Sequence, residues 1–162
     1  EAVPLLHHAL ANDWDLRFIE QMPLDAGDLW ARPVMVTADE IQQQLEQEFT
    51  LTPVPTRGSA PAEEFYVDGG PATVGIIASV TRPFCSACDR LRLTADGQLR
   101  NCLFAREETD VRALLRSDKT PGEKCEGIRE ILQLVTKAKL PGHGINDPNF
   151  IKPERPMSAI GG

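Results

Sequence analysis

The sequence FCSACDRLRLTADGQLRNCLF, residues 84–104, decides how the chain is organised, because it holds three of the four cysteines. Two residues separate Cys85 from Cys88, and Cys102 follows after thirteen more. The Asp-Gly pair at 96–97 predicts a tight turn, since glycine accepts the positive φ that hairpin turns require. Leucines recur in short strand-like runs on either side of this turn. We therefore expect a hairpin that folds Cys102 back toward Cys85 and Cys88.

Three converging thiolates predict a soft metal centre, because thiolates are the ligands of zinc and of iron–sulfur clusters. A closed zinc site needs four protein ligands. Three cysteines instead suit a 4Fe-4S cluster with one iron open to a substrate atom. A zinc site completed by His143 is the main alternative. Buried apolar thiols or a disulfide are weaker ones, and no secretory signal supports the disulfide.

Arg90 and Arg92 lie between the cysteines and alternate by two, so in a strand they would face the same side. Two guanidinium groups on one face form an anion site suited to a triphosphate. Ion pairs with nearby surface carboxylates would explain the same pattern, and the residues alone leave both interpretations open.

The composition of the 162 residues is that of one globular domain, with 41% hydrophobic and 25% charged residues. A net charge of −7 disfavours nucleic-acid binding through a general basic surface. The chain shows no apolar run near the roughly 20 residues that a membrane span needs, and it shows no signal peptide. Clustered cysteines without such a signal predict a reducing, cytoplasmic location. Because Glu1 falls inside a predicted helix, we expect the chain to be a fragment.

Hydrophobic periodicity predicts both helices and strands along the chain. Helices are expected at 2–14, 37–49, 110–116 and 121–139, and strands at 15–22, 51–54, 64–67 and 73–80. Thr37 and Glu40 predict a capping box. Cys125 lies at helical spacing with Ile128, so we expect it to be a buried structural thiol. Residues 141–162 show no period, and their composition is typical of a disordered terminus.

Three stretches resemble the GTP 3′,8-cyclase (MoaA) family, the radical S-adenosylmethionine (SAM) enzymes of molybdenum cofactor biosynthesis. The block at 84–104 resembles the motif of the family's second cluster. The others are RFIEQMP at 17–23 and the carboxyl end from His143 to the final glycines. The resemblance covers only the C-terminal half of such an enzyme, because the C-x3-C-x2-C motif of the SAM-cleaving cluster is absent.

The resemblance implies an α/β fold class, which would be α+β in this fragment. Residues 1–56 would form the end of a partial TIM-like radical SAM barrel, with its last strand and helices. Residues 57–162 would form the region that binds the cluster and GTP, with a small sheet carrying the cluster hairpin and an extended Gly-Gly tail.

The resemblance also implies roles for individual residues. Cys85, Cys88 and Cys102 would hold the second 4Fe-4S cluster. GTP would contact Arg17, Arg90 and Arg92, SAM would contact Met22, and the catalytic tail would end in Gly161 and Gly162. Spacing alone would instead place Arg17 and Glu20 on a solvated strand face and Met22 in the core.

The implied reaction is SAM-dependent radical cyclisation of GTP by a lyase whose first 4Fe-4S cluster lies outside this chain. This chain alone is therefore expected to be inactive. Cyclic pyranopterin monophosphate synthase would act downstream. A homodimer is a further expectation, although the sequence does not reveal the oligomeric state. Two other functions are a zinc-binding Cys3His interaction module and a sulfur-carrier-like protein that is adenylated at its Gly-Gly terminus.

Overall fold

The computed structural model describes residues 1–25, 27 and 29–160. The chain divides into two compact units, each described here by itself. The first unit comprises Glu1–Met22 and Trp30–Cys88, and the second comprises Pro23–Leu29 and Asp89–Gly162.

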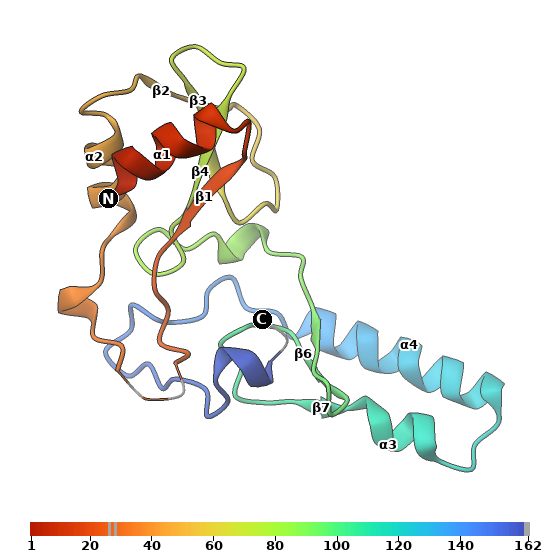
Figure 1. Ribbon diagram of the computed structural model, residues 1–162. Coiled ribbons are helices and arrows are strands. Elements are labelled where there is room, and N and C mark those ends of the chain that lie inside the picture. Colours follow the sequence, from red (N-terminus) through yellow and green to blue (C-terminus); the bar gives the residue numbers. More distant parts are fainter. Residues whose placement is uncertain (26, 28, 161–162) are drawn as a thin grey trace. The chain divides into compact units, whose positions relative to one another are not determined.

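The first unit is a four-stranded sheet with the strand order β1-β4-β3-β2 (Figure 1). Strand β1 runs parallel to β4, whereas β3 is antiparallel to both β4 and β2. The strands are β1 (Leu16–Ile19), β2 (Leu51–Pro53), β3 (Glu63–Val67) and β4 (Thr73–Ile77), and the helical segments are α1 (Ala2–Ala11), η1 (Arg32–Val34) and α2 (Ala38–Leu45).

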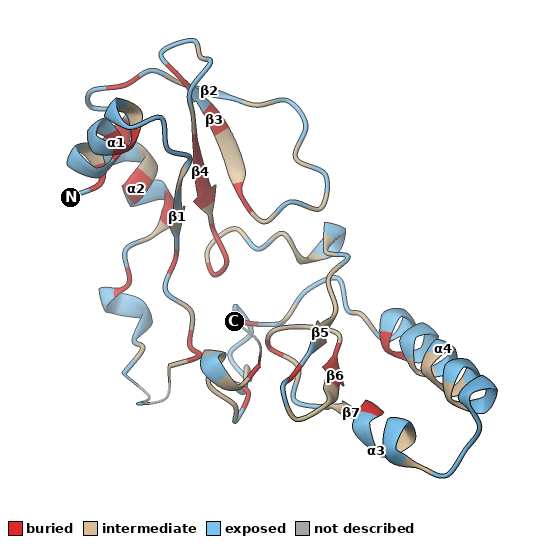
Figure 2. Cartoon of the chain, turned by 45° about the vertical axis from the view of Figure 1, so that its right-hand side comes forward, coloured by how far each residue is buried: buried red, intermediate tan, exposed pale blue. Residues whose placement is uncertain are grey.

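The core of the first unit lies between the sheet and the two helices α1 and α2. Leu6 of α1 and Leu45 of α2 pack with Val74 and Ile76 of the central strand β4. All four side chains are essentially inaccessible to solvent, and Figure 2 shows β4 as the most buried strand of this sheet. Burial of each such side chain contributes about 1.5–3 kcal/mol, so this layer fixes the position of β1 beside β4.

Local chemistry sets the boundaries of these elements. Thr37 and Glu40 form the predicted capping box at the start of α2. The turn between β3 and β4 contains Gly69 and Gly70, both with positive φ. The predicted run 73–80 is buried along most of its length, as expected, but its ladder ends at Ile77.

The second unit contains the predicted hairpin, formed by β5 (Arg92–Leu93) and β6 (Gln98–Arg100). Gly97 supplies the turn with a φ of 85°. Strand β7 (Thr109–Asp110), which was not predicted, pairs with the other side of β6. The helical segments are α3 (Val111–Arg116), α4 (Pro121–Lys137) and η3 (Met157–Ala159), with η2 (Cys85–Ala87) belonging to the first unit.

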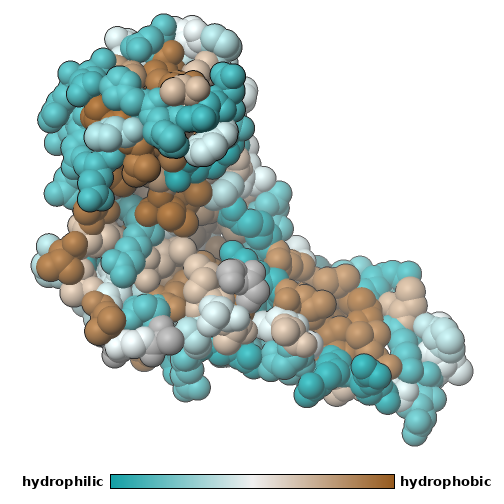
Figure 3. All heavy atoms as spheres, in the orientation of Figure 1, coloured by the Kyte–Doolittle hydropathy of each residue, from teal (hydrophilic) through white to brown (hydrophobic). Residues whose placement is uncertain are grey.

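Helix α4 is largely exposed, and the predicted burial of Cys125 is wrong. The helix turns Ile128, Ile131 and Val135 toward β6 and α3, and this rotation leaves Cys125 in solvent. Leu132 and Leu134 are also exposed, and Figure 3 shows hydrophobic side chains gathered over this helix.

The structure therefore has a mixed α and β architecture with two small sheets. Within the described ranges neither sheet closes into a barrel, so the TIM-like barrel stays a prediction. None of the helices in these ranges is long and apolar enough to cross a membrane.

Candidate functional site

Cys85 and Cys88 lie at the two ends of one tight turn. Cys85 begins η2, and Cys88 caps it by donating its backbone N–H to the carbonyl of Cys85 at 3.1 Å. Both side chains are half-buried, and none of the four cysteines, all of which the structure describes, forms a disulfide. The backbone of this turn thus presents one thiol at each of its two ends.

The buried carboxylate of Glu20 fixes the segment that leads into this turn. Glu20 follows β1 and is only 1% exposed. It accepts hydrogen bonds from the backbone N–H groups of Ala38 and Val80, both at 2.7 Å, and from the N–H and hydroxyl groups of Thr81. Burial raises the pKa of Glu20, but these hydrogen bonds more than offset that effect and leave the pKa below its ordinary value.

Sequence reasoning missed this role of Glu20. The solvated strand face expected from spacing holds for Arg17, which is exposed, but is wrong for Glu20. The alternation of residues along β1 stops at Ile19, and the next carboxylate turns inward to the start of α2 and the end of the β4 segment. An acidic residue directly after an apolar strand was the only available signal.

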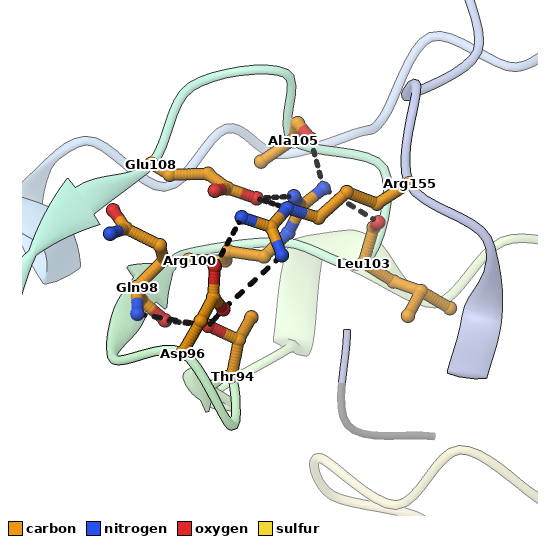
Figure 4. Close-up of polar contacts among 8 residues, drawn as sticks. All are labelled: Thr94, Asp96, Gln98, Arg100, Leu103, Ala105, Glu108 and Arg155. Atoms are coloured by element: carbon orange, nitrogen blue, oxygen red, sulfur yellow. Dashed lines mark hydrogen bonds and ion pairs between the residues drawn. The ribbon is translucent and has the colours of Figure 1, made fainter. Parts of the chain in front are cut away.

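Cys102 lies in the loop after β6, in the second unit. Its sulfur accepts a hydrogen bond from the backbone N–H of Phe104 at 3.4 Å. Arg100, only 2% exposed, donates to the carbonyl groups of Leu103 and Ala105 and forms an ion pair with Glu108 (Figure 4). One buried guanidinium therefore holds both sides of the loop that carries Cys102, a role that the sequence did not reveal.

Lys139 ties this loop to the segment between the cysteines. Its ammonium group donates to the carbonyl of Arg90 at 2.7 Å and to that of Asn101 at 2.6 Å. The side chain of Asn101 in turn donates to the carbonyl of Ala138 at 2.9 Å. The two residues that directly follow α4 thus fix the backbone at Arg90 and next to Cys102.

The two predicted phosphate-binding arginines between the cysteines are both half-buried. Arg92 lies in β5 opposite Arg100, but Arg90 precedes the strand. Strand alternation therefore does not place the two side chains on one face. Their roles toward a triphosphate stay predictions.

Arg17 lies in the first unit and donates to Glu64 of β3 at 2.8 Å. Gly75 of β4 pairs in register with both residues. A Cβ atom at Gly75 would lie 2.9 Å from Cγ of Arg17, so the missing side chain gives the arginine its path across β4. Arg17 is thus an exposed guanidinium with one carboxylate partner.

The described part of the carboxyl-terminal tail makes specific tertiary contacts, which differ from the disorder expected from its composition. Ile160 is completely buried, and the N–H group of Met157 donates to the carbonyl of Leu24 at 2.8 Å. Gly161 and Gly162, predicted to be catalytic, lie outside the described residues.

Two further predicted site residues are half-buried, His143 in the second unit and Met22 in the first. The ring of His143 packs against Phe104, with centroids 4.5 Å apart, and its Nδ1 accepts from the N–H group of Ile145 at 3.1 Å. The roles of His143 toward zinc and of Met22 toward SAM stay predictions.

The cysteine pair belongs to the first unit, whereas Cys102 and His143 belong to the second. In the described part of the chain, no group of three or more His, Cys, Asp or Glu side chains is arranged to hold a metal ion. Convergence of the three thiols therefore stays a prediction. The donor set still fits an iron–sulfur cluster, because it consists of reduced, half-buried cysteines, one already accepting an N–H group.

Comparisons with known proteins give consistent matches. Residues 14–145 match the family model described as Molybdenum Cofactor Synthesis C. The whole chain is 60% identical to the GTP 3′,8-cyclase of Streptomyces coelicolor, over 47% of that protein's length. It is 54% identical to the GTP 3′,8-cyclase of Mycolicibacterium smegmatis, over 45% of that protein. The chain therefore spans about half the length of these relatives.

Proposed function

Because the chain belongs to the Molybdenum Cofactor Synthesis C family, we propose that it is the carboxyl-terminal region of a GTP 3′,8-cyclase. In the full-length enzyme, this region binds a second 4Fe-4S cluster and GTP for a SAM-dependent radical cyclisation in molybdenum cofactor biosynthesis. The observation that carries the proposal is 60% identity over the entire chain to a protein of that name.

Cys85, Cys88 and Cys102 hold the cluster in this proposal. Their number supports it, because three thiolates leave one iron without a protein ligand. When bound, the cluster supplies an open iron that can take an atom of the guanine base. The chain's own contribution is to fix the ligands, through Glu20 before the cysteine pair and Arg100 around Cys102.

GTP is held by the arginines Arg17, Arg90 and Arg92, whose permanent charge and planar donor groups suit phosphate oxygens. Such binding would orient the ribose for attack, since a fixed geometry lowers the entropic part of the barrier. Met22 contacts SAM, and Gly161 and Gly162 form the catalytic end of the tail. The radical chemistry itself is supplied by the cofactors.

The chain alone lacks the C-x3-C-x2-C motif for the SAM-cleaving cluster. We therefore propose that it has no cyclase activity without the remainder of the enzyme. The product would pass to a cyclic pyranopterin monophosphate synthase, a partner implied by the family.

The test uses the full-length enzyme, purified without oxygen. Replacing Arg90 or Arg92 with alanine should weaken GTP binding about tenfold, because each change removes charge-assisted hydrogen bonds. Iron content should not change. Arg116→Ala, in an exposed position of α3, is the matched control and should bind GTP normally. Unchanged GTP affinity in both variants would reject the phosphate-binding assignment.

A further inference from the structure

We infer that Arg155 is a positioning residue that fastens the carboxyl-terminal tail to the hairpin carrying Cys102. The inference deepens the proposed function and rests on it for its catalytic consequence. Its structural part rests on contacts within the second unit alone. The structural part and the proposed function can therefore fail separately.

Arg155 makes three contacts with two carboxylates. Its Nη1 and Nη2 donate to the two carboxylate oxygens of Asp96, at 3.2 and 2.8 Å, and its Nε lies 2.8 Å from Oε1 of Glu108 (Figure 4). Asp96 belongs to the turn between β5 and β6, whereas Glu108 follows the Cys102 loop. Arg155 of the tail thus binds one carboxylate that precedes Cys102 in the chain and one that follows it.

The same network shapes the cysteine loop. The Oε1 atom of Glu108 is shared by Arg155 and by Arg100, which is buried and also donates to the carbonyl groups of Leu103 and Ala105. Arg155 of the tail and Arg100, which holds the loop, therefore bind the same carboxylate oxygen. Loss of Arg155 would remove one of the two cations that Glu108 faces, beside a guanidinium that is only 2% exposed.

This arrangement differs from a single exposed ion pair, which is worth little. Arg155 uses the bidentate geometry that a guanidinium makes with a carboxylate, and it joins a network of two arginines and two carboxylates. Its hydrogen bonds to Asp96, together with the one that the Thr94 hydroxyl donates, lower the pKa of that carboxyl to about 2. The network thus favours the charged forms that hold the tail.

Beyond Arg155 the tail is fastened again. Met157 donates its N–H group to the carbonyl of Leu24 at 2.8 Å, and the side chain of Ile160 is completely buried. Arg155 therefore sets where the last described turn, η3, begins relative to the hairpin. In the proposed enzyme, the segment fastened in this way leads to the end of the chain that we propose to be catalytic.

The test compares Arg155→Ala, Arg155→Lys and Glu154→Ala in the full-length protein. Glu154 is the matched control, because it is the exposed neighbour of Arg155. Backbone hydrogen exchange at residues 157–160 should quicken about tenfold in Arg155→Ala, since charged hydrogen bonds fasten this segment. Arg155→Lys should restore only part of the protection, because an ammonium group cannot span both carboxylates in this way.

Activity supplies a second readout that a general loss of stability would not reproduce. Arg155→Ala should lower kcat about tenfold while KM for GTP and iron content stay at wild-type values. Asp96→Asn should have a similar effect on exchange, and adding it to Arg155→Ala should cause little further change. Wild-type exchange at 157–160 in both Arg155→Ala and Asp96→Asn would overturn the inference.

The two proposals give different failures. Fast exchange in Arg155→Ala would support the structural part of the inference. If the wild-type enzyme then showed no cyclase activity, the proposed function would be rejected. Fast exchange with an unchanged kcat would show that the fastened tail has no part in turnover, and would overturn the catalytic part of the inference.

Discussion

Arg17 of β1 reaches Glu64 of β3 at 2.8 Å across the strand that separates them. The side chain can take this path because Gly75 of β4, in register with both, has no Cβ atom. If Arg17 binds phosphate, then Glu64 is the carboxylate that the phosphate must displace.

Glu64→Gln should therefore tighten GTP binding by the full-length enzyme. The exposed ion pair is worth at most about 1 kcal/mol, so the expected gain in affinity is about two- to fivefold. Equilibrium binding of GTP measures it. The control is Glu130→Gln, which removes the same charge from an exposed position of α4 and should change nothing. Weaker binding in Glu64→Gln would contradict the role of Arg17.

Gly75→Ala should displace Arg17 and destabilise the first unit. The new methyl group would lie 2.9 Å from Cγ of Arg17 and 3.2 Å from Cβ of Ala62, so either the arginine or the sheet must shift. We expect a loss of about 1–3 kcal/mol in the free energy of unfolding, measured by denaturant titration. In contrast, Gly122→Ala in α4 meets no atom within 4 Å and should be neutral or slightly stabilising.

Glu20→Gln should loosen the segment before the cysteine pair. A neutral amide cannot accept all the N–H and hydroxyl donors that the carboxylate now satisfies. The expected cost is about 1–3 kcal/mol in unfolding free energy. Iron content after anaerobic preparation should also fall, because Thr81 would no longer be fixed next to the turn that carries Cys85. Normal iron content with normal stability would reject this positioning role.

The carboxyl group of Asp96 should titrate with a pKa of about 2, below its ordinary value of 3.8, because Arg155 and Thr94 hydrogen-bond to its charged form. The folded-state pKa is lowered, so the stabilisation is fully present above pH 3.8 and is lost as pH falls toward 2. An NMR titration of the side-chain carboxyl carbon measures this shift. In Arg155→Ala the midpoint should move back toward 3.8. An unshifted midpoint in the wild type would exclude the charged contact.

The hairpin and the start of α2 could be predicted because their causes are local. The turn at Gly97 depends on one glycine φ, and the capping box needs only residues three apart. The rotation of α4 could not be predicted, because a stripe through Cys125 and a stripe through Ile131 both contain Ile128 and Val135. Packing against β6 and α3 places Ile131 against the core and leaves Cys125 exposed.

The positioning residues were hidden for a different reason. Glu20 binds Val80, and Arg155 binds Asp96, so each contact joins segments about sixty residues apart. No periodicity connects such positions. The contacts of the tail could not be predicted for the same reason. Its composition is typical of disorder, but Arg155 and Ile160 hold it in place through distant partners. Convergence of the three thiols stays a prediction.

Iron and acid-labile sulfide content of the anaerobically prepared chain tests the central claim most directly. We predict about four irons and four sulfides per chain. Cys102→Ser should lose most of this iron, whereas Cys125→Ser, which alters the exposed thiol of α4, should retain it. One equivalent of zinc in place of iron, or equal metal content in Cys102→Ser and the wild type, would contradict the account.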